Sequence, residues 1–191
     1  MANNNILVGI DFGTTNTVIS YFENNKVKIL KNYHKSIIPT VVYIDLNENI
    51  ACGNDIPINS NTENILISSF KTKIGTNSQL GEFNDKKWYV KDILLIYFNY
   101  LKKLIISKLK STEISAIISV PSNFNDNQRD IIKTTFTNIG INIIRIINEP
   151  TAAALAYGFK KSNDEELLLV IDLGGGTLDL SVLEIDDNFY E

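Results

Sequence analysis

One pattern occurs twice in the sequence, as Ile6-Leu-Val-Gly-Ile-Asp-Phe-Gly-Thr-Thr15 and as Leu168-Leu-Val-Ile-Asp-Leu-Gly-Gly-Gly-Thr177. Each copy is an apolar segment that ends in an aspartate, followed by a turn of glycine and threonine. A second apolar segment then begins, at 17–22 in the first copy and at 178–185 in the second. One such turn is common in β-hairpins, but two copies of the longer pattern indicate two related hairpins with a shared role.

The two turns contain the residues that a phosphate-binding loop needs. Glycine has no Cβ and adopts backbone angles that aim successive N–H groups into one hollow, and threonine hydroxyls add directed hydrogen bonds. Neither turn ends in the Gly-Lys-Ser/Thr of a Walker loop, and neither leads into a helix as a Rossmann fingerprint does. The sequence therefore predicts a phosphate site made by two hairpin turns, 13–15 and 174–177.

Acidic residues lie at the ends of the same apolar segments. Asp11 and Asp172 end predicted strands, where an unpaired carboxylate is costly, and a hydrated Mg²⁺ between them would offset that cost. Glu149 ends another predicted strand just before a helix, so by itself it is typical of a helix cap. Beside the two aspartates we interpret Glu149 as part of the same site.

The composition favours a folded protein and argues against some classes of partner. Hydrophobic residues make up 44% of the 191 residues, enough for a substantial core. The formal net charge of −4, from 18 basic and 22 acidic residues, argues against nucleic acid or a membrane surface as a partner. No signal peptide or membrane-length apolar run is visible, and the single cysteine, Cys52, fits a reduced cytoplasmic setting as a buried apolar residue.

Periodicity and capping signals predict an α/β chain with a mixed sheet. The expected strands are 6–11, 17–22, 26–30, 41–44, 116–120, 143–147, 167–172 and 178–185. The expected helices are 65–71, 92–110, 125–140 and one that opens at Glu149. Asp92 is the expected cap of the long helix, and Asn125 with Gln128 forms a capping box.

Four motifs resemble, in order, the signatures of the seventy-kilodalton heat-shock chaperones. They are Ile10-Asp-Phe-Gly-Thr-Thr-Asn16, Val120-Pro-Ser-Asn-Phe-Asn-Asp126, Ile146-Ile-Asn-Glu-Pro-Thr-Ala-Ala-Ala-Leu-Ala-Tyr-Gly158 and Ile171-Asp-Leu-Gly-Gly-Gly-Thr-Leu-Asp179. The first and last are similar to motifs of actin-like ATPases and sugar kinases in general. The two central motifs are far more specific to the chaperones, and the resemblance covers most of the chain.

The resemblance implies an actin-like ATPase fold of the ribonuclease H-like type. Residues 1–166 would form the first lobe, with a subdomain around 72–91 that is shorter than the family pattern. Residues 167–191 would form the first hairpin of the second lobe, whose remaining part is absent. We expect that hairpin to have open edges, and therefore to show weak self-association or mobility over 167–185.

The resemblance also implies roles in ATP hydrolysis for individual residues. The implied contacts to the phosphates of ATP or ADP come from Gly13, Thr14, Thr15, Gly174, Gly175, Gly176 and Thr177. The implied metal residues are Asp11 and Asp172, which bind Mg²⁺ mostly through water, with K⁺ as a further cation. The implied catalytic residues are Lys71, Glu149, Thr177 and Asp179.

For the intact protein the resemblance implies an ATP-driven chaperone. Pro121 and Arg129 match residues that relay the nucleotide state to a peptide-binding domain. The implied partners are unfolded peptides, J-domain co-chaperones and nucleotide-exchange factors. Because the adenosine-binding segment is absent, we expect this chain alone to bind ATP poorly and to hydrolyse very little. Two alternatives stay open: a sugar-kinase type of phosphotransferase, and a non-catalytic interaction module.

Overall fold

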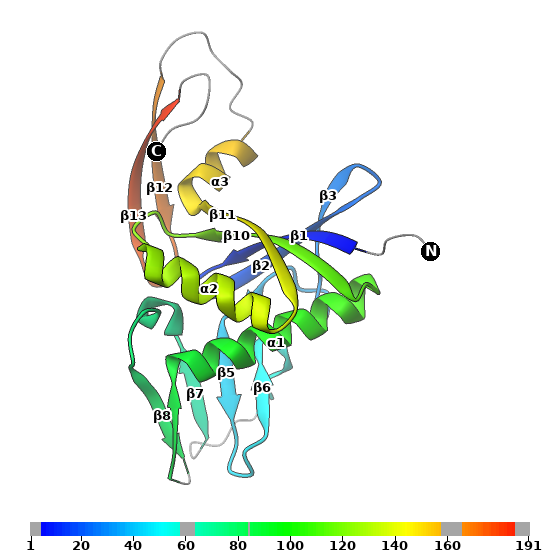
Figure 1. Ribbon diagram of the computed structural model, residues 1–191, viewed down its shortest axis with the longest axis vertical. Helices are drawn as coiled ribbons and strands as arrows, with labels where there is room; N and C mark the ends of the chain where they lie inside the picture. The colour runs from blue at the N-terminus through cyan, green and yellow to red at the C-terminus, as the bar shows by residue number, and fades with distance from the viewer. Residues whose placement is uncertain (1–4, 58–63, 84, 158–165, 186–191) are drawn as a thin grey trace.

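A six-stranded mixed sheet lies at the centre of the computed structural model, which describes residues 5–57, 64–83, 85–157 and 166–185 (Figure 1). The order along the sheet is β11 (Ile141–Asn148), β10 (Glu113–Val120), β1 (Asn5–Phe12), β2 (Asn16–Glu23) and β3 (Lys26–Ile29), and β4 (Ile38–Pro39) pairs with β2. Strands β1, β10 and β11 are parallel to one another. Their carboxyl ends therefore meet at one edge of the sheet, where ligands usually bind in α/β folds.

Helices α1 (Val90–Leu109) and α2 (Asp126–Asn138) supply the core that covers this sheet. The apolar side of α1 is buried through Leu94, Phe98, Leu101 and Ile105. The Phe98 ring stacks on Phe136 of α2 with ring centroids 3.9 Å apart, and its edge packs on Phe12 of β1 at 5.1 Å. These aromatic contacts join both helices to the strand that leads into the first glycine turn.

Local signals predicted two features of these elements correctly. Asn24 and Asn25 have φ angles of 52° and 58°, as a tight turn between β2 and β3 requires. The Asn125 side chain accepts a hydrogen bond from the Gln128 amide at 3.0 Å, and the Gln128 side chain accepts one from the Asn125 amide at 3.0 Å. The capping box at the start of α2 is therefore confirmed.

The cap of α1 differs from the prediction by three positions. The helix begins at Val90, and its N-cap is Tyr89. The Asp92 carboxylate accepts the Tyr89 amide at 3.0 Å, so Asp92 stands in the first helical turn as the second member of a capping box. An acidic residue at this position serves either role, because both place a carboxylate near the exposed N–H groups of the first turn.

The predicted helix over 65–71 is wrong. Residues Ile65–Ser68 form β7, which pairs with β5 (Val41–Ile44), and β5 also pairs with β6 (Ile50–Cys52). A short 3₁₀ helix, Phe70–Lys73, follows β7. The alternating burial of Ile67 against its neighbours is a strand pattern, and pairing with β5 decides between helix and strand for so short a segment.

The remaining strands form two hairpins. Strands β8 (Gln79–Phe83) and β9 (Lys86–Tyr89) occupy the short segment before α1, where no strand was predicted. Strands β12 (Glu166–Leu173) and β13 (Leu178–Ile185) form a separate two-stranded sheet, as expected. The helix α3 (Glu149–Ala156) contacts β10, β11 and this last hairpin. Cys52 is buried, as predicted.

None of the helices in the described part of the chain is long and apolar enough to cross a lipid bilayer.

Candidate functional site: two glycine turns across one cavity

The two glycine turns share one backbone hydrogen bond. The Gly13 amide donates to the Asn16 carbonyl at 2.9 Å, and the Gly174 amide donates to the Thr177 carbonyl at 2.9 Å. Strand pairing continues this correspondence, with Asp11 opposite Val18 in the first hairpin and Asp172 opposite Asp179 in the second. The structural repeat therefore matches Thr177 with Asn16.

The two turns lie against each other. A Cβ added to Gly175 would lie 2.6 Å from Thr15 Oγ1, and one added to Gly176 would lie 3.6 Å from Thr14 Cγ2. None of the four turn glycines has a φ angle in the left-handed region. Of the two predicted reasons for glycine here, the missing side chain is confirmed, because it lets the turns approach so closely, and no left-handed angle contributes.

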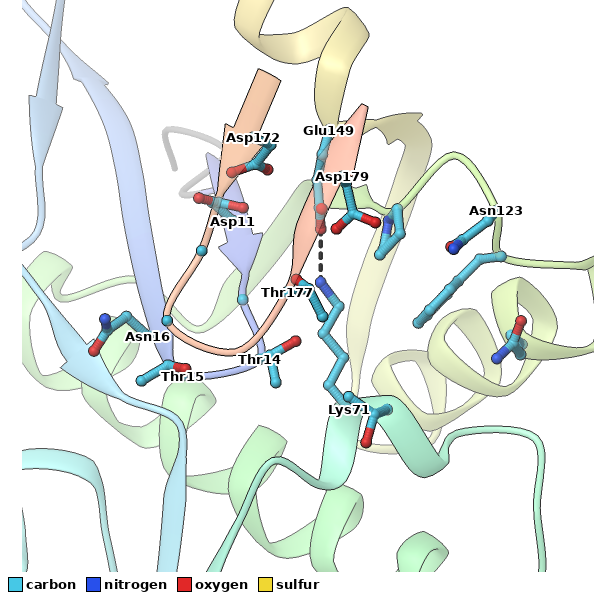
Figure 2. A pocket seen from close by; sticks show the side chains of 17 residues that line it. Asp11, Thr14, Thr15, Asn16, Lys71, Asn123, Glu149, Asp172, Thr177 and Asp179 are labelled. Atoms are coloured by element: carbon cyan, nitrogen blue, oxygen red, sulfur yellow. Dashed lines mark hydrogen bonds and ion pairs between the residues drawn. The ribbon is translucent and has the colours of Figure 1, made fainter. Parts of the chain in front are cut away.

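A cavity of about 410 Å³ opens between the turns (Figure 2). Every predicted phosphate-binding, catalytic and metal residue lines it except Gly176. Figure 2 shows the side chains of Asp11, Asp172, Asp179 and Glu149 directed into the same space, with Lys71 entering from the opposite side. Residues far apart in the sequence thus meet at the carboxyl ends of the central strands.

Lys71 is buried in this cavity. Its ammonium donates to Glu149 Oε1 at 2.6 Å, which joins the 3₁₀ helix after β7 to the start of α3. The same nitrogen lies 5.7 Å from the ring centroid of Phe12 and 5.8 Å from that of Phe124. Apolar walls around a buried charge strengthen its attraction to any anion that enters the cavity.

Glu149 carries the electrostatic signature of the site. Burial raises the pKa of the Glu149 carboxyl above its ordinary value, and the nearby charges of Asp11 and Asp172 raise that pKa further. The Lys71 ammonium opposes these effects by attraction and by its hydrogen bond. One cation therefore balances several crowded carboxylates in this cavity, an arrangement typical of functional sites.

Comparison with known proteins identifies the family. Residues 80–191, more than half of the chain, match the family model described as Hsp70 protein. The chain belongs to the Hsp70 family. It is 40% identical over 186 residues to the chaperone protein DnaK of Mycoplasma mobile, which covers 97% of this chain and 31% of that protein. It is 41% identical over 180 residues to the chaperone protein DnaK of Mycoplasma mycoides, which covers 94% of this chain and 30% of that protein.

The Hsp70-family chain thus spans about a third of the length of the curated relatives that it matches. Its mixed sheet and flanking helices agree with the amino-terminal lobe of the Hsp70 actin-like ATPase fold, as the sequence predicted.

The acidic residues of this Hsp70-family site suit a hydrated cation. Ser119 of β10 donates to Asp11 Oδ1 at 2.8 Å, which fixes the aspartate at the strand end where Asp11 and Ser119 pair in register. Within the part of the chain that the structure describes, no three acidic, histidine or cysteine side chains are close enough to hold a metal directly. Carboxylates that face two glycine turns across a roomy cavity fit Mg²⁺, which retains several water ligands.

The two predicted relay residues lie beside the cavity at different depths. Pro121 lines the cavity, whereas Arg129 lies behind its wall. Arg129 donates through Nε to the Phe124 carbonyl at 2.9 Å and through Nη2 to Asn148 Oδ1 at 2.6 Å. Arg129 thereby connects the loop after β10 to the residue that precedes Glu149.

Several lining residues had no predicted role in the site. They are Asn16, Thr72, Asn123, Phe124 and Gln128. Asn123 and Phe124 belong to the chaperone-like motif at 120–126, so the motif held a signal for them. Gln128 was interpreted only as a helix cap, but its side-chain amide also donates to the Ile74 carbonyl at 3.0 Å. No local pattern reports that contact, because the two residues are 54 positions apart.

Proposed function

We propose that this chain provides the phosphate-binding part of the ATPase site of an ATP-hydrolysing molecular chaperone. The observation that carries the proposal is the pair of equivalent glycine turns that face one cavity together with the buried Lys71–Glu149 pair. Phosphoryl transfer depends mainly on positioning and on stabilising negative charge. The cavity brings together the groups that both tasks require.

Each group has a distinct proposed task. The turn amides and the hydroxyls of Thr14, Thr15 and Thr177 bind the β- and γ-phosphates of ATP or ADP from two sides. Asp11 and Asp172 hold Mg²⁺ through water, and the metal supplies charge neutralisation on the phosphates. A K⁺ ion is a further proposed cofactor.

Lys71 and Glu149 form the proposed catalytic pair, with Asp179 beside them. The Lys71 ammonium stabilises charge on the transferred phosphoryl group, and the carboxylates of Glu149 and Asp179 order the attacking water. A phosphate that enters the cavity competes with Glu149 for Lys71, since both are anions within reach of one buried ammonium.

The intact protein is proposed to act in the cytoplasm as a chaperone that couples its nucleotide state to the binding of unfolded peptides. Pro121 and Arg129 would relay that state, and J-domain co-chaperones and nucleotide-exchange factors would regulate it. Residues 1–166 are assigned to the first lobe and 167–191 to the first hairpin of the second. The chain alone is expected to hydrolyse ATP hardly at all.

Thermal unfolding of the chain tests the phosphate site. We expect MgATP, MgADP and magnesium tripolyphosphate at millimolar concentration to raise the unfolding temperature, and adenosine to leave it unchanged, because a ligand of the folded state stabilises it. Lys71→Met should remove most of the shift. Lys73→Met is the matched control, since Lys73 belongs to the same 3₁₀ helix and is exposed outside the cavity.

Two outcomes would contradict parts of the proposal. A wild-type chain that no phosphate compound stabilises would disprove the phosphate site. Rapid ATP turnover by the chain, abolished by Lys71→Ala, would support the site and disprove the expected low activity.

A further inference from the structure

A tyrosine hydroxyl lies inside the hydrophobic core. Tyr97 of α1 is completely buried, and its ring packs against Phe12 and Phe70 with centroid distances of 6.1 Å and 5.6 Å. A hydroxyl in such surroundings is costly unless it is hydrogen-bonded. The Tyr97 oxygen meets this need 3.0 Å from Thr17 Oγ1 and 3.1 Å from the Pro39 carbonyl oxygen.

These contacts lead from α1 to the first glycine turn. Thr17 Oγ1 lies 3.0 Å from Thr40 Oγ1, and both threonines are completely buried. The Thr40 amide donates to the Thr15 carbonyl at 2.8 Å. Three buried hydroxyls therefore form one cluster, Tyr97–Thr17–Thr40, which ends on the backbone of the turn itself.

Strand pairing connects the cluster to the backbone of the turn. Asn16 pairs with Pro39 and Thr17 with Ile38, so the segment 38–40 runs beside the carboxyl end of the turn. Tyr97 contacts both members of this short ladder. Its hydroxyl therefore fixes β2 and β4 against the helix at the point where the turn begins to face the cavity.

We propose that Tyr97 is a positioning residue for the first phosphate turn, acting through Thr17 and Thr40 on the Thr15 carbonyl. The second turn has no such support among the described residues. Thr17 corresponds there to Leu178, which is apolar and exposed. The consequence for ligand binding rests on the proposed phosphate site, whereas the consequence for the backbone of the turn does not.

A neighbour on the same helix supplies a matched control. The Tyr100 ring lies 6.0 Å from that of Tyr97, and its hydroxyl accepts a hydrogen bond from Asn32 Nδ2 at 3.1 Å, away from the turn. Tyr97→Phe and Tyr100→Phe remove the same atom from neighbouring sites. Only the first substitution removes a contact to the segment that holds Thr15.

Amide hydrogen exchange of the complete chain, without ligand, tests the positioning role directly. Because a hydrogen bond contributes about 1 kcal/mol, the Thr40 amide should exchange about fivefold faster in Tyr97→Phe than in the wild type, after correction for global stability. Tyr100→Phe should leave the corrected rate unchanged. Equal Thr40 rates in the two variants would overturn the proposal.

Binding of magnesium tripolyphosphate then tests the functional consequence. Tyr97→Phe should raise the dissociation constant about fivefold, and Tyr100→Phe should leave it unchanged. In a Thr40→Val background, which lacks the hydroxyl but keeps the amide, Tyr97→Phe should have a smaller further effect, because only its direct contact to the Pro39 carbonyl still reaches this segment. A full additional loss in that background would contradict the cluster. A wild-type chain that binds no phosphate would disprove the proposed function, and the exchange rates would still decide the role of Tyr97.

Discussion

The β1–β2 and β12–β13 hairpins have the same turn and opposite environments. Ile10 of the first hairpin is 1% exposed, and its counterpart Ile171 in the second is 62% exposed. On the other face the relation is reversed, since Phe22 is 63% exposed and its counterpart Leu183 is 1% exposed. The same strand register therefore supports a glycine turn whichever face of the hairpin is packed.

The difference follows from which element covers each hairpin. The helices α1 and α2 bury the Ile10 face of β1, whereas α3 lies against the second hairpin. Both arrangements leave the start of each turn free to face the cavity, where Asp11 and Asp172 lie. The turn hydrogen bond and the strand register are thus shared by the two copies of the repeated sequence, and burial is imposed by the surrounding fold.

Substitution of the paired isoleucines should have the largest effect on this contrast. Ile10→Ala should lower the free energy of unfolding by about 4 kcal/mol, because it leaves a cavity in the packed core. Ile171→Ala should cost less than about 0.5 kcal/mol, as exposed positions usually do. Urea denaturation measures both values, and equal losses would contradict the assigned burial of the two faces.

The Lys71–Glu149 pair shares the cavity with both hairpins, and its energetics depend on one aspartate from each, Asp11 and Asp172. Lys71→Met leaves the Glu149 carboxylate without its cation beside Asp11 and Asp172, and should cost about 3 kcal/mol at pH 7. The loss should be smaller near pH 4.5, the ordinary pKa of a glutamate, where protonation removes the unpaired charge.

The sign follows from proton linkage. The folded-state pKa of Glu149 is raised, so the folded protein binds more protons than the unfolded chain, and stability falls as pH rises from the unfolded pKa through the folded one. Without Lys71 the folded-state pKa of Glu149 rises further, so stability falls over a wider pH interval. Urea denaturation at pH 7 and near pH 4.5 measures the loss of unfolding free energy in Lys71→Met at each pH. The double variant Lys71→Met/Glu149→Gln should lose this pH dependence. A loss for Lys71→Met that is independent of pH would contradict the assigned coupling.

The turn glycines should respond differently although they are equivalent. A Cβ at Gly13 would lie 2.3 Å from the Asn16 carbonyl oxygen, whereas one at Gly174 would meet the Thr177 carbonyl at 3.5 Å, an ordinary contact. Gly13→Ala should therefore cost about 2 kcal/mol, since the backbone of the turn must move. Gly174→Ala should have little effect on the unfolding temperature. The reverse order would show that the two turns differ in shape from the structure described.

The features predicted correctly from the sequence depend on nearby residues. Both glycine turns, the Asn24-Asn25 turn and the Asn125–Gln128 capping box are decided within a few positions, where propensity and side-chain hydrogen bonds act directly. The family motifs extended this reach. They indicated Lys71, which by composition alone is one more lysine, and the structure places it in the cavity beside Glu149.

The features that were missed depend on contacts between distant segments. Ile65–Ser68 is a short apolar run that suits a helix or a strand, and only its pairing with β5 makes it a strand. Tyr97 lies on the apolar side of α1. Nothing in its neighbourhood along the chain reveals that its hydroxyl forms a hydrogen bond with Thr17, 80 positions away. The reversed burial of the two hairpins was equally hidden, because both have similar apolar alternation.

Self-association is the smallest expected consequence of the contrast between the hairpins. Ile171 and Leu180 pair across β12 and β13, and both side chains are exposed, so this apolar face should support weak contacts between copies of the chain. The weight-average sedimentation coefficient should rise with concentration, and Ile171→Ser/Leu180→Ser should remove the rise.

The matched control is Phe22→Ser/Val27→Ser, an exposed cross-strand pair on the first hairpin. The first hairpin exposes a smaller apolar group around this pair, with Ile29 beside Val27. The second hairpin exposes a longer row: Leu167, Leu169, Ile171, Leu173, Leu178, Leu180 and Val182. Only Ile171→Ser/Leu180→Ser should therefore abolish association. A wild-type chain that stays monomeric at high concentration would contradict the prediction, because the exposed row would then not bind a second copy of the chain.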